Sequence, residues 1–178
     1  VKCGAYTQTP ETAGLFHLYE HMMFKGNSLY PNAAAVQDAL SKLGVASWNG
    51  TTSLECVNYF FTIPSDKIED GLNFWNSAIR FPLLDKRELK NKKKVVISEI
   101  QGNEVNPQRI LYAANSKQMF PDAPWKMDTS GSVKVISDTT VKQLKQIKNQ
   151  FYIPNNAALF VGGDVNPEEV FKLVNKIF

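Results

Sequence analysis

The spacing of hydrophobic positions along the chain predicts a series of amphipathic helices. Between residues 33 and 43 the apolar side chains fall three and four positions apart, as on one face of a helix, and Gly44 follows as a typical helix end. Asn32 stands just before this stripe, where a capping residue is expected, and Ser65 stands in the same relation to the next one. Helices are predicted over residues 15–25, 33–43, 65–79, 85–103, 107–119, from a cap at Asp138 or Thr139 to about Gln150, and over 167–177.

Shorter apolar segments predict strands between these helices. Residues 56–63 are rich in aromatic and β-branched side chains and end at Pro64, which is typical of a buried strand. Residues 157–162 show a similar pattern, residues 46–52 look extended, and residues 1–6 are interpreted as the tail of another strand. Because helices and strands are mixed without regular βαβ alternation, the pattern favours an α+β fold.

Composition narrows the class of protein. A length of 178 residues fits one domain with a hydrophobic core, and no apolar run is long enough to span a membrane. The net charge is only +3, and the lysines of residues 90–94 and 142–148 are interpreted as solvated helix faces, so we expect no nucleic-acid partner. Cys3 and Cys56 could pair or stay as thiols, and they indicate no compartment.

The two histidines of the chain, His17 and His21, stand four residues apart with Glu20 between them, as an H-x-x-E-H string. On a helix this spacing places both imidazoles on one face, one turn apart, where they can bind a single Zn²⁺ ion. Glu20 leans toward the same face and can take a proton from a water held by the metal. The string is the inverted form of the zincin motif H-E-x-x-H.

A hydrolytic zinc site needs three protein ligands, and the chain has no third histidine. Glu99 is the best candidate, because it lies in the middle of a predicted helix in an apolar setting where an unpaired carboxylate would be costly. Glu104 is the second candidate, although it should lie at the end of that helix, where it is more exposed to solvent. Glu55 could contribute only if its strand runs close to the histidines.

At these positions the chain resembles the pitrilysin or insulinase-type metallopeptidases, the inverzincins of peptidase family M16. Residues 14–26 resemble the zinc-binding helix of that family, and residues 95–100 resemble the segment that carries the glutamate ligand. Glu99 follows His21 by 78 positions (99 − 21), close to the usual gap of the family. Further similar segments, in the family's order, are Leu43-Gly44, residues 49–52, residues 59–64, Gly131 with Ile136, residues 152–157 and residues 162–165.

The resemblance implies an α+β domain with a mixed, largely antiparallel β-sheet packed with helices, as in the mitochondrial processing peptidase-like metallohydrolases. It implies a zinc endopeptidase in which His17, His21 and Glu99 bind Zn²⁺ and Glu20 acts as general base.

The family also suggests how substrate binds. The strand at Asn49 and Gly50 would pair with an extended peptide through its backbone, which selects short or unfolded peptides.

Two departures from the family pattern bear on activity. Members usually carry a second glutamate two helical turns before the ligand glutamate, and here that position (99 − 7) is Lys92, a cation that could face the site. We also expect residues 1–178 to be a single peptidase domain truncated at its N-terminal strands, with the homologous partner domain that closes over the substrate absent from this chain.

These departures leave an alternative function open. Some relatives are non-catalytic scaffold or assembly subunits that retain the fold, and Lys92 favours this reading. The complete set of ligands together with Glu20 favours the zinc endopeptidase.

Overall fold

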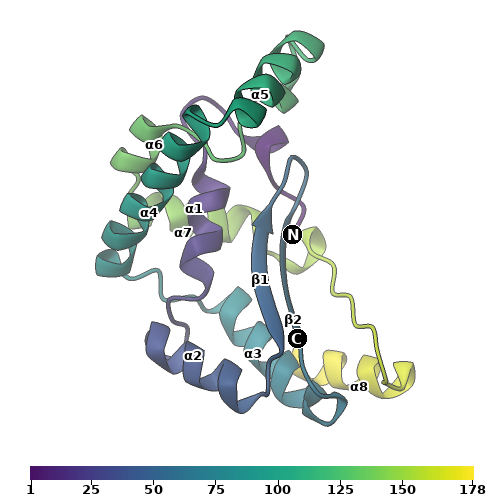
Figure 1. Cartoon of the computed structure of the whole chain (residues 1–178). Helices are drawn as coiled ribbons and strands as arrows, with labels where there is room; N and C mark the ends of the chain where they lie inside the picture. Colours follow the sequence, from purple (N-terminus) through teal and green to yellow (C-terminus); the bar gives the residue numbers. More distant parts are fainter.

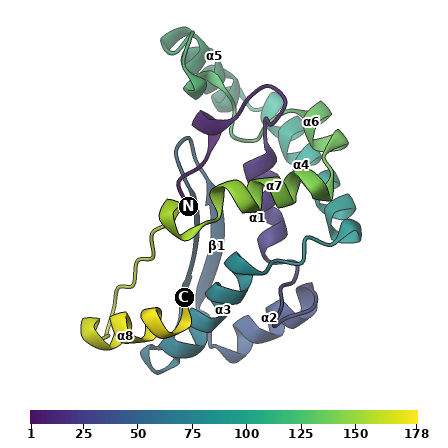
Figure 2. The ribbon, with the colours of Figure 1, turned by 180° about the vertical axis from the view of Figure 1, so that it is seen from behind.

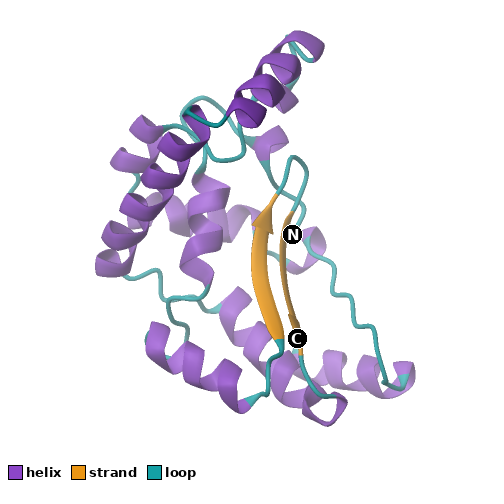
Figure 3. Ribbon diagram, viewed as in Figure 1, coloured by secondary structure: helices purple, strands orange, loops and turns teal.

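A computed structural model describes all 178 residues and shows a mainly helical molecule with one β-hairpin (Figure 3). The helices are α1 (Leu15–Met23), α2 (Ala33–Lys42), α3 (Ile68–Arg80), α4 (Lys86–Glu104), α5 (Pro107–Met119), α6 (Val133–Asp138), α7 (Val141–Phe151) and α8 (Pro167–Ile177), and the strands are β1 (Ser47–Thr52) and β2 (Val57–Thr62). The α+β prediction is confirmed.

Helix α1 lies at the centre of the molecule. It packs against α4, α6, α7 and β1, and Figure 1 shows it between α4 and the hairpin. Figure 2, from behind, shows α7 crossing its other side. Six of its nine residues are buried and belong to the main hydrophobic core: Leu15, Phe16, Leu18, Tyr19, Met22 and Met23.

The hairpin pairs β1 with β2 in antiparallel register, with Gly50 opposite Tyr59. Along β2 the side chains alternate, with Val57 buried and Asn58 and Phe60 exposed, so one face packs on the core. The segment is therefore half-buried, not the fully buried strand that its composition predicted. Strand β1 has β2 as its one strand partner, and Figure 1 shows its other edge on the side of α1.

Side-chain caps fix the starts of five of the eight helices, namely α2, α4, α5, α7 and α8. The side chain of Asn32 accepts a hydrogen bond from the Ala35 N–H at 2.9 Å, which confirms it as the N-cap of α2. The N-cap of α7 is Thr140, so the cap predicted at Asp138 or Thr139 is wrong by one or two positions. A short helix, α6, ends there, and α7 begins at Val141 with a capping box made by Thr140 and Gln143.

Two predicted strands are wrong. Residues 5–7 form a 3₁₀ turn, and no strand forms in this segment. Val1 exchanges backbone hydrogen bonds with Val57 at 2.8 and 3.0 Å, and the N–H groups of Ala5 and Tyr6 donate to the Ser53 and Leu54 carbonyls of the hairpin turn at 3.3 and 2.9 Å. Residues 157–162 form no strand, and Phe160 is 89% exposed. An apolar pattern makes a strand only where a neighbouring strand completes the hydrogen-bond ladder, and the one sheet consists of β1 and β2, so no strand pairs with this segment.

The remaining elements surround this centre. Helix α8 packs on α3 with its predicted inner residues half-buried, and α5 continues beyond the end of α4 and extends away from the rest of the molecule (Figure 1). None of the helices combines the length and the apolar character that crossing a membrane would require.

Candidate metal centre

Helix α1 places His17, Glu20 and His21 on one open face, because the side chains of its other face are buried in the hydrophobic core. These three side chains are the half-buried ones among its nine residues, so they share the one open face of the helix. Gly14 is the N-cap of the helix, and it packs so closely against Gly131 that a Cβ atom on either residue would collide with the other's backbone. This contact fixes the start of α1 against the segment that follows α5.

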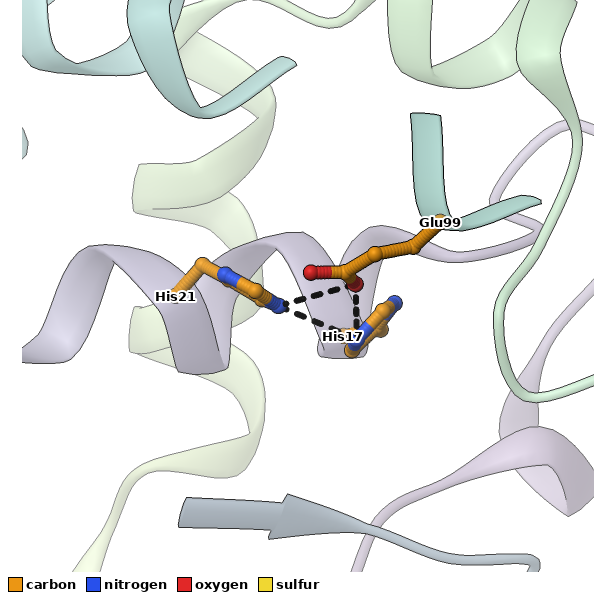
Figure 4. A group of neighbouring side chains, drawn as sticks. All are labelled: His17, His21 and Glu99. Carbon is orange, nitrogen blue, oxygen red and sulfur yellow. Dashed lines mark hydrogen bonds and ion pairs between the residues drawn. The ribbon is translucent and has the colours of Figure 1, made fainter. Parts of the chain in front are cut away.

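Helix α4 brings a third potential ligand to the histidines. The Nε2 atoms of His17 and His21 lie 3.1 Å apart, and each lies 3.5 Å from the same carboxylate oxygen of Glu99 (Figure 4). Neighbouring ligand atoms around a tetrahedral Zn²⁺ ion are about 3.3 Å apart, given zinc–ligand bonds of about 2.0–2.1 Å. The three atoms therefore form a triangle of the size that zinc requires, and they are the one cluster of this kind in the chain.

The chemistry of the histidines also fits a metal. Burial, together with the charges of His17, Lys92 and Lys25, lowers the pKa of His21 to about 4. The imidazole is therefore neutral at pH 7, and metal binding need not displace a proton from it. Nitrogen, nitrogen and carboxylate oxygen form a donor set that zinc accepts. The residues present fit the metal.

Glu20 lies between the histidine pair and β1. Burial raises the pKa of its carboxyl group, while a hydrogen bond of 2.6 Å donated by the Thr52 hydroxyl lowers it. The side chain passes directly over Gly50, where a Cβ atom would lie 2.7 Å from the Glu20 Cγ. Thr52 was not identified from the sequence as a partner of Glu20, although it belongs to a segment that resembles the family signature.

The surroundings of Glu99 differ from the prediction. Its side chain is 43% exposed, because Val96 and Ile100 occupy the buried face of α4. Glu99 thus lacks the apolar setting that was predicted for it, although its carboxylate does reach both histidines. Glu104 ends α4 and Glu55 lies in the hairpin turn, and neither joins the cluster.

Lys92 lies on the side of α4 that faces the site. It is half-buried, and its charge lowers the pKa values of both His21 and Lys25. Glu88 raises the pKa of Lys25, so this carboxylate lies close enough to balance part of the positive charge. A cation thus stands beside the candidate metal centre, at the position where the resemblance predicted a glutamate, and the three potential ligand atoms still form their triangle.

A cavity of about 340 Å³ opens onto the candidate metal centre. Its lining contains no hydrophobic residue and consists of His17, Glu20, Gly50, Thr51, Thr52, Glu99, Asn103, Arg109, Thr129 and Ser130. Of the two predicted substrate contacts, Gly50 lines the cavity and Asn49 does not. The Asn49 side chain is exposed and accepts a hydrogen bond from the Gly50 N–H at 2.9 Å. Sequence reasoning missed Asn103 and Arg109.

Family models match most of the chain. A model described as insulinase (peptidase family M16) matches residues 1–132, and one described as the peptidase M16 inactive domain matches residues 138–178.

Individual relatives are zinc proteases by name. An uncharacterized zinc protease of Rickettsia felis is 23% identical over 177 residues, which cover 99% of this chain and 42% of the relative. The zinc protease YmfH of Bacillus subtilis is 29% identical over 163 residues, covering 92% of this chain and 36% of the relative. The crystal structure of a protease from Helicobacter pylori superposes with a TM-score of 0.92 at 24% identity, over 99% of this chain and 42% of that one. The chain thus spans less than half the length of these proteins.

Proposed function

The chain belongs to the insulinase family of peptidases, peptidase family M16, and we propose that it carries the metal centre of a zinc-dependent endopeptidase. The observation that carries the proposal is the convergence of His17, His21 and Glu99 on one point, with the Glu20 carboxylate on the same face of α1. Its relatives are zinc proteases, which supports a peptidase function in general.

In this proposal His17, His21 and Glu99 hold Zn²⁺, which supplies a Lewis acid that polarises the peptide carbonyl and lowers the pKa of water. Glu20 takes the proton from the attacking water and returns it to the nitrogen of the leaving amine. The Thr52 hydroxyl holds one Glu20 oxygen at 2.6 Å, which leaves the other oxygen free to accept the proton. The partial burial of Glu20 raises its pKa toward the working pH of a general base.

The substrate would be a short or unfolded peptide bound in an extended conformation. Residues 50–52 of β1 line the cavity, and β1 is paired on one side only, so a peptide could add to its other edge through backbone hydrogen bonds. A folded protein rarely has an unpaired extended segment that could pair with β1 in this way. Opening of the Asn49–Gly50 hydrogen bond would free the Gly50 N–H for the substrate, which gives Asn49 an indirect role.

A second, homologous domain or subunit would complete the substrate chamber. The cavity is bounded by α1, α4, α5 and β1 on this chain, and the relatives are more than twice as long as the part that this chain matches. We expect the 178-residue chain alone to bind zinc but to turn over peptides weakly or not at all.

A non-catalytic scaffold or assembly subunit is the second candidate, and Lys92 is the observation that favours it. Its positive charge beside His21 opposes that of a bound Zn²⁺ ion, which would weaken metal binding. If the chain belongs to such a subunit, the protein should fold and bind its partners but should not cleave peptides in the presence of zinc.

Glu20→Gln in the full-length protein, loaded with zinc, separates the two candidates. General-base catalysis predicts that the substitution lowers kcat about 10²–10⁴-fold on an unstructured fluorogenic peptide, with zinc content unchanged. Glu55→Gln is the matched control, because it removes a carboxylate from the exposed hairpin turn. Absence of peptide cleavage by the parent protein would favour the scaffold, and equal cleavage by the parent and Glu20→Gln would contradict the role of Glu20 as general base.

A further inference from the structure

Arg109 lies in the wall of the metal-site cavity and also in a neighbouring one. It is the third residue of α5, and the Asn106 side chain accepts hydrogen bonds from the N–H groups of Gln108 and Arg109 at 3.0 and 3.3 Å. This cap fixes the first turn of the helix. A second cavity of about 230 Å³ shares Arg109, Thr52 and Thr129 with the first, so Arg109 borders both.

The guanidinium of Arg109 has no acidic partner. The ion pairs of the chain are those of Glu99 with the two histidines, Lys42 with Asp38, and Lys176 with Glu69, and no hydrogen bond engages the Arg109 side chain. The acidic residues that share its two cavities are Glu20, Glu99 and Asp128. Glu20 is held by Thr52, Glu99 is directed to the histidines, and Asp128 accepts a hydrogen bond from the Ser130 N–H at 2.7 Å.

The rest of the wall of the metal-site cavity provides few apolar contacts for a substrate side chain. None of its lining residues is hydrophobic, and the polar wall is itself held in place, since the Asn103 side chain donates to the Ser130 hydroxyl at 2.9 Å. Burial of an aliphatic group here would gain almost no apolar contact. A carboxylate, by contrast, can accept two parallel hydrogen bonds from a guanidinium that is always charged.

We propose that Arg109 is a specificity-determining residue that selects peptides with a carboxylate close to the bond to be cleaved. The proposal rests on the proposed peptidase function and names its substrate class. Two sources offer the same chemistry: an Asp or Glu side chain within a residue or two of the cleaved bond, or the C-terminal carboxylate of a short peptide. Lys126 does not compete for this role, because its ammonium donates to the Pro121 carbonyl.

The test compares matched fluorogenic peptides on the full-length, zinc-loaded protein. Peptides that differ only by Glu, Gln or Leu at each position near the cleaved bond test the side chain, and free and amidated C-termini test the terminal carboxylate. We expect kcat/KM about tenfold higher for the carboxylate form than for its neutral isostere at one position. Arg109→Gln should bring this ratio to about one, and Arg109→Glu should reverse it in favour of a Lys-containing peptide.

Lys117→Gln is the matched control, because it removes a charge from the exposed end of the same helix, away from both cavities. It should leave the ratio of the parent protein unchanged. A parent ratio near one, or a ratio that survives in Arg109→Gln, would overturn the inference while leaving the peptidase function intact.

A binding measurement distinguishes failure of the proposed role of Arg109 from failure of the proposed peptidase function. Fluorescence anisotropy of the labelled carboxylate and amide peptides, on Glu20→Gln protein, reports affinity without turnover. Tighter binding of the carboxylate form that is lost in Arg109→Gln, together with no cleavage by the parent, would refute the peptidase function and retain the role of Arg109. If the parent protein shows no cleavage and the binding shows no preference for the carboxylate peptide, both proposals are refuted.

Discussion

Helices α1 and α5 both contribute side chains to the cavity, but they are held in the molecule in opposite ways. Six of the nine residues of α1 are buried, whereas Ser116 is the one buried residue of α5. Both histidines and Glu20 thus stand on an element that the core fixes on several sides, as the small tolerances of a metal centre require. The group proposed for specificity stands on an exposed helix that can change its surface residues at little cost in stability.

The largest expected effect is on the free energy of unfolding, which a substitution in α1 should lower far more than one in α5. Leu18→Ala in α1 removes a fully buried side chain and should lower the free energy of unfolding by about 2–5 kcal/mol. Leu111→Ala in α5 removes a side chain that is 63% exposed and should change it by about 0.5 kcal/mol or less. Urea denaturation measures both, and equal losses would contradict the contrast between the helices.

The next effect concerns the hydrogen bond that joins β1 to the α1 side of the site. Thr52→Val removes the hydroxyl that lowers the pKa of Glu20, so the pKa should rise. Because a general base acts in its ionised form, the acidic limb of kcat/KM should move to higher pH, and activity near neutral pH should fall about tenfold.

Thr52→Ser is the conservative control for this substitution and should restore the profile of the parent protein. An unchanged acidic limb in Thr52→Val would show that the hydrogen bond has no part in holding the base.

A smaller effect is expected at alkaline pH in the core beneath the site. Burial raises the pKa of Cys3 from 9.0 to about 12, and it also raises the pKa of Tyr19. Above about pH 9 the unfolded chain therefore loses protons that the folded chain keeps, so stability falls as the pH rises. The melting temperature should decline between pH 9 and 11, and Cys3→Ala should make this decline shallower. A decline of the same steepness in Cys3→Ala would exclude this thiol as a cause.

The contrast between the helices also shows what the sequence could predict. The α1 histidines and Glu20 were assigned from spacing alone, because a helix fixes which side chains share a face whatever surrounds it. The bounds of α5, Pro107 to Met119, were predicted correctly, because proline is favoured at the first position of a helix.

What the sequence could not predict depends on how separate elements meet. That Arg109 reaches the metal-site cavity follows from the turn between α4 and α5, which no local pattern specifies. The assignment of Glu99 was made for an apolar setting that the structure does not have, because the position of a residue on a helix face depends on the partner that covers it. Residues 157–162 failed as a strand for a related reason, since a ladder needs a neighbour.

The central claim is that α1 and α4 together form a three-ligand zinc site, and elemental analysis of the purified chain tests it most directly. The site predicts about one zinc ion per chain, lost in Glu99→Ala and retained in Glu104→Ala, which removes a carboxylate from the end of the same helix. Absence of zinc from the parent chain after loading, or equal zinc in the parent and Glu99→Ala, would contradict it.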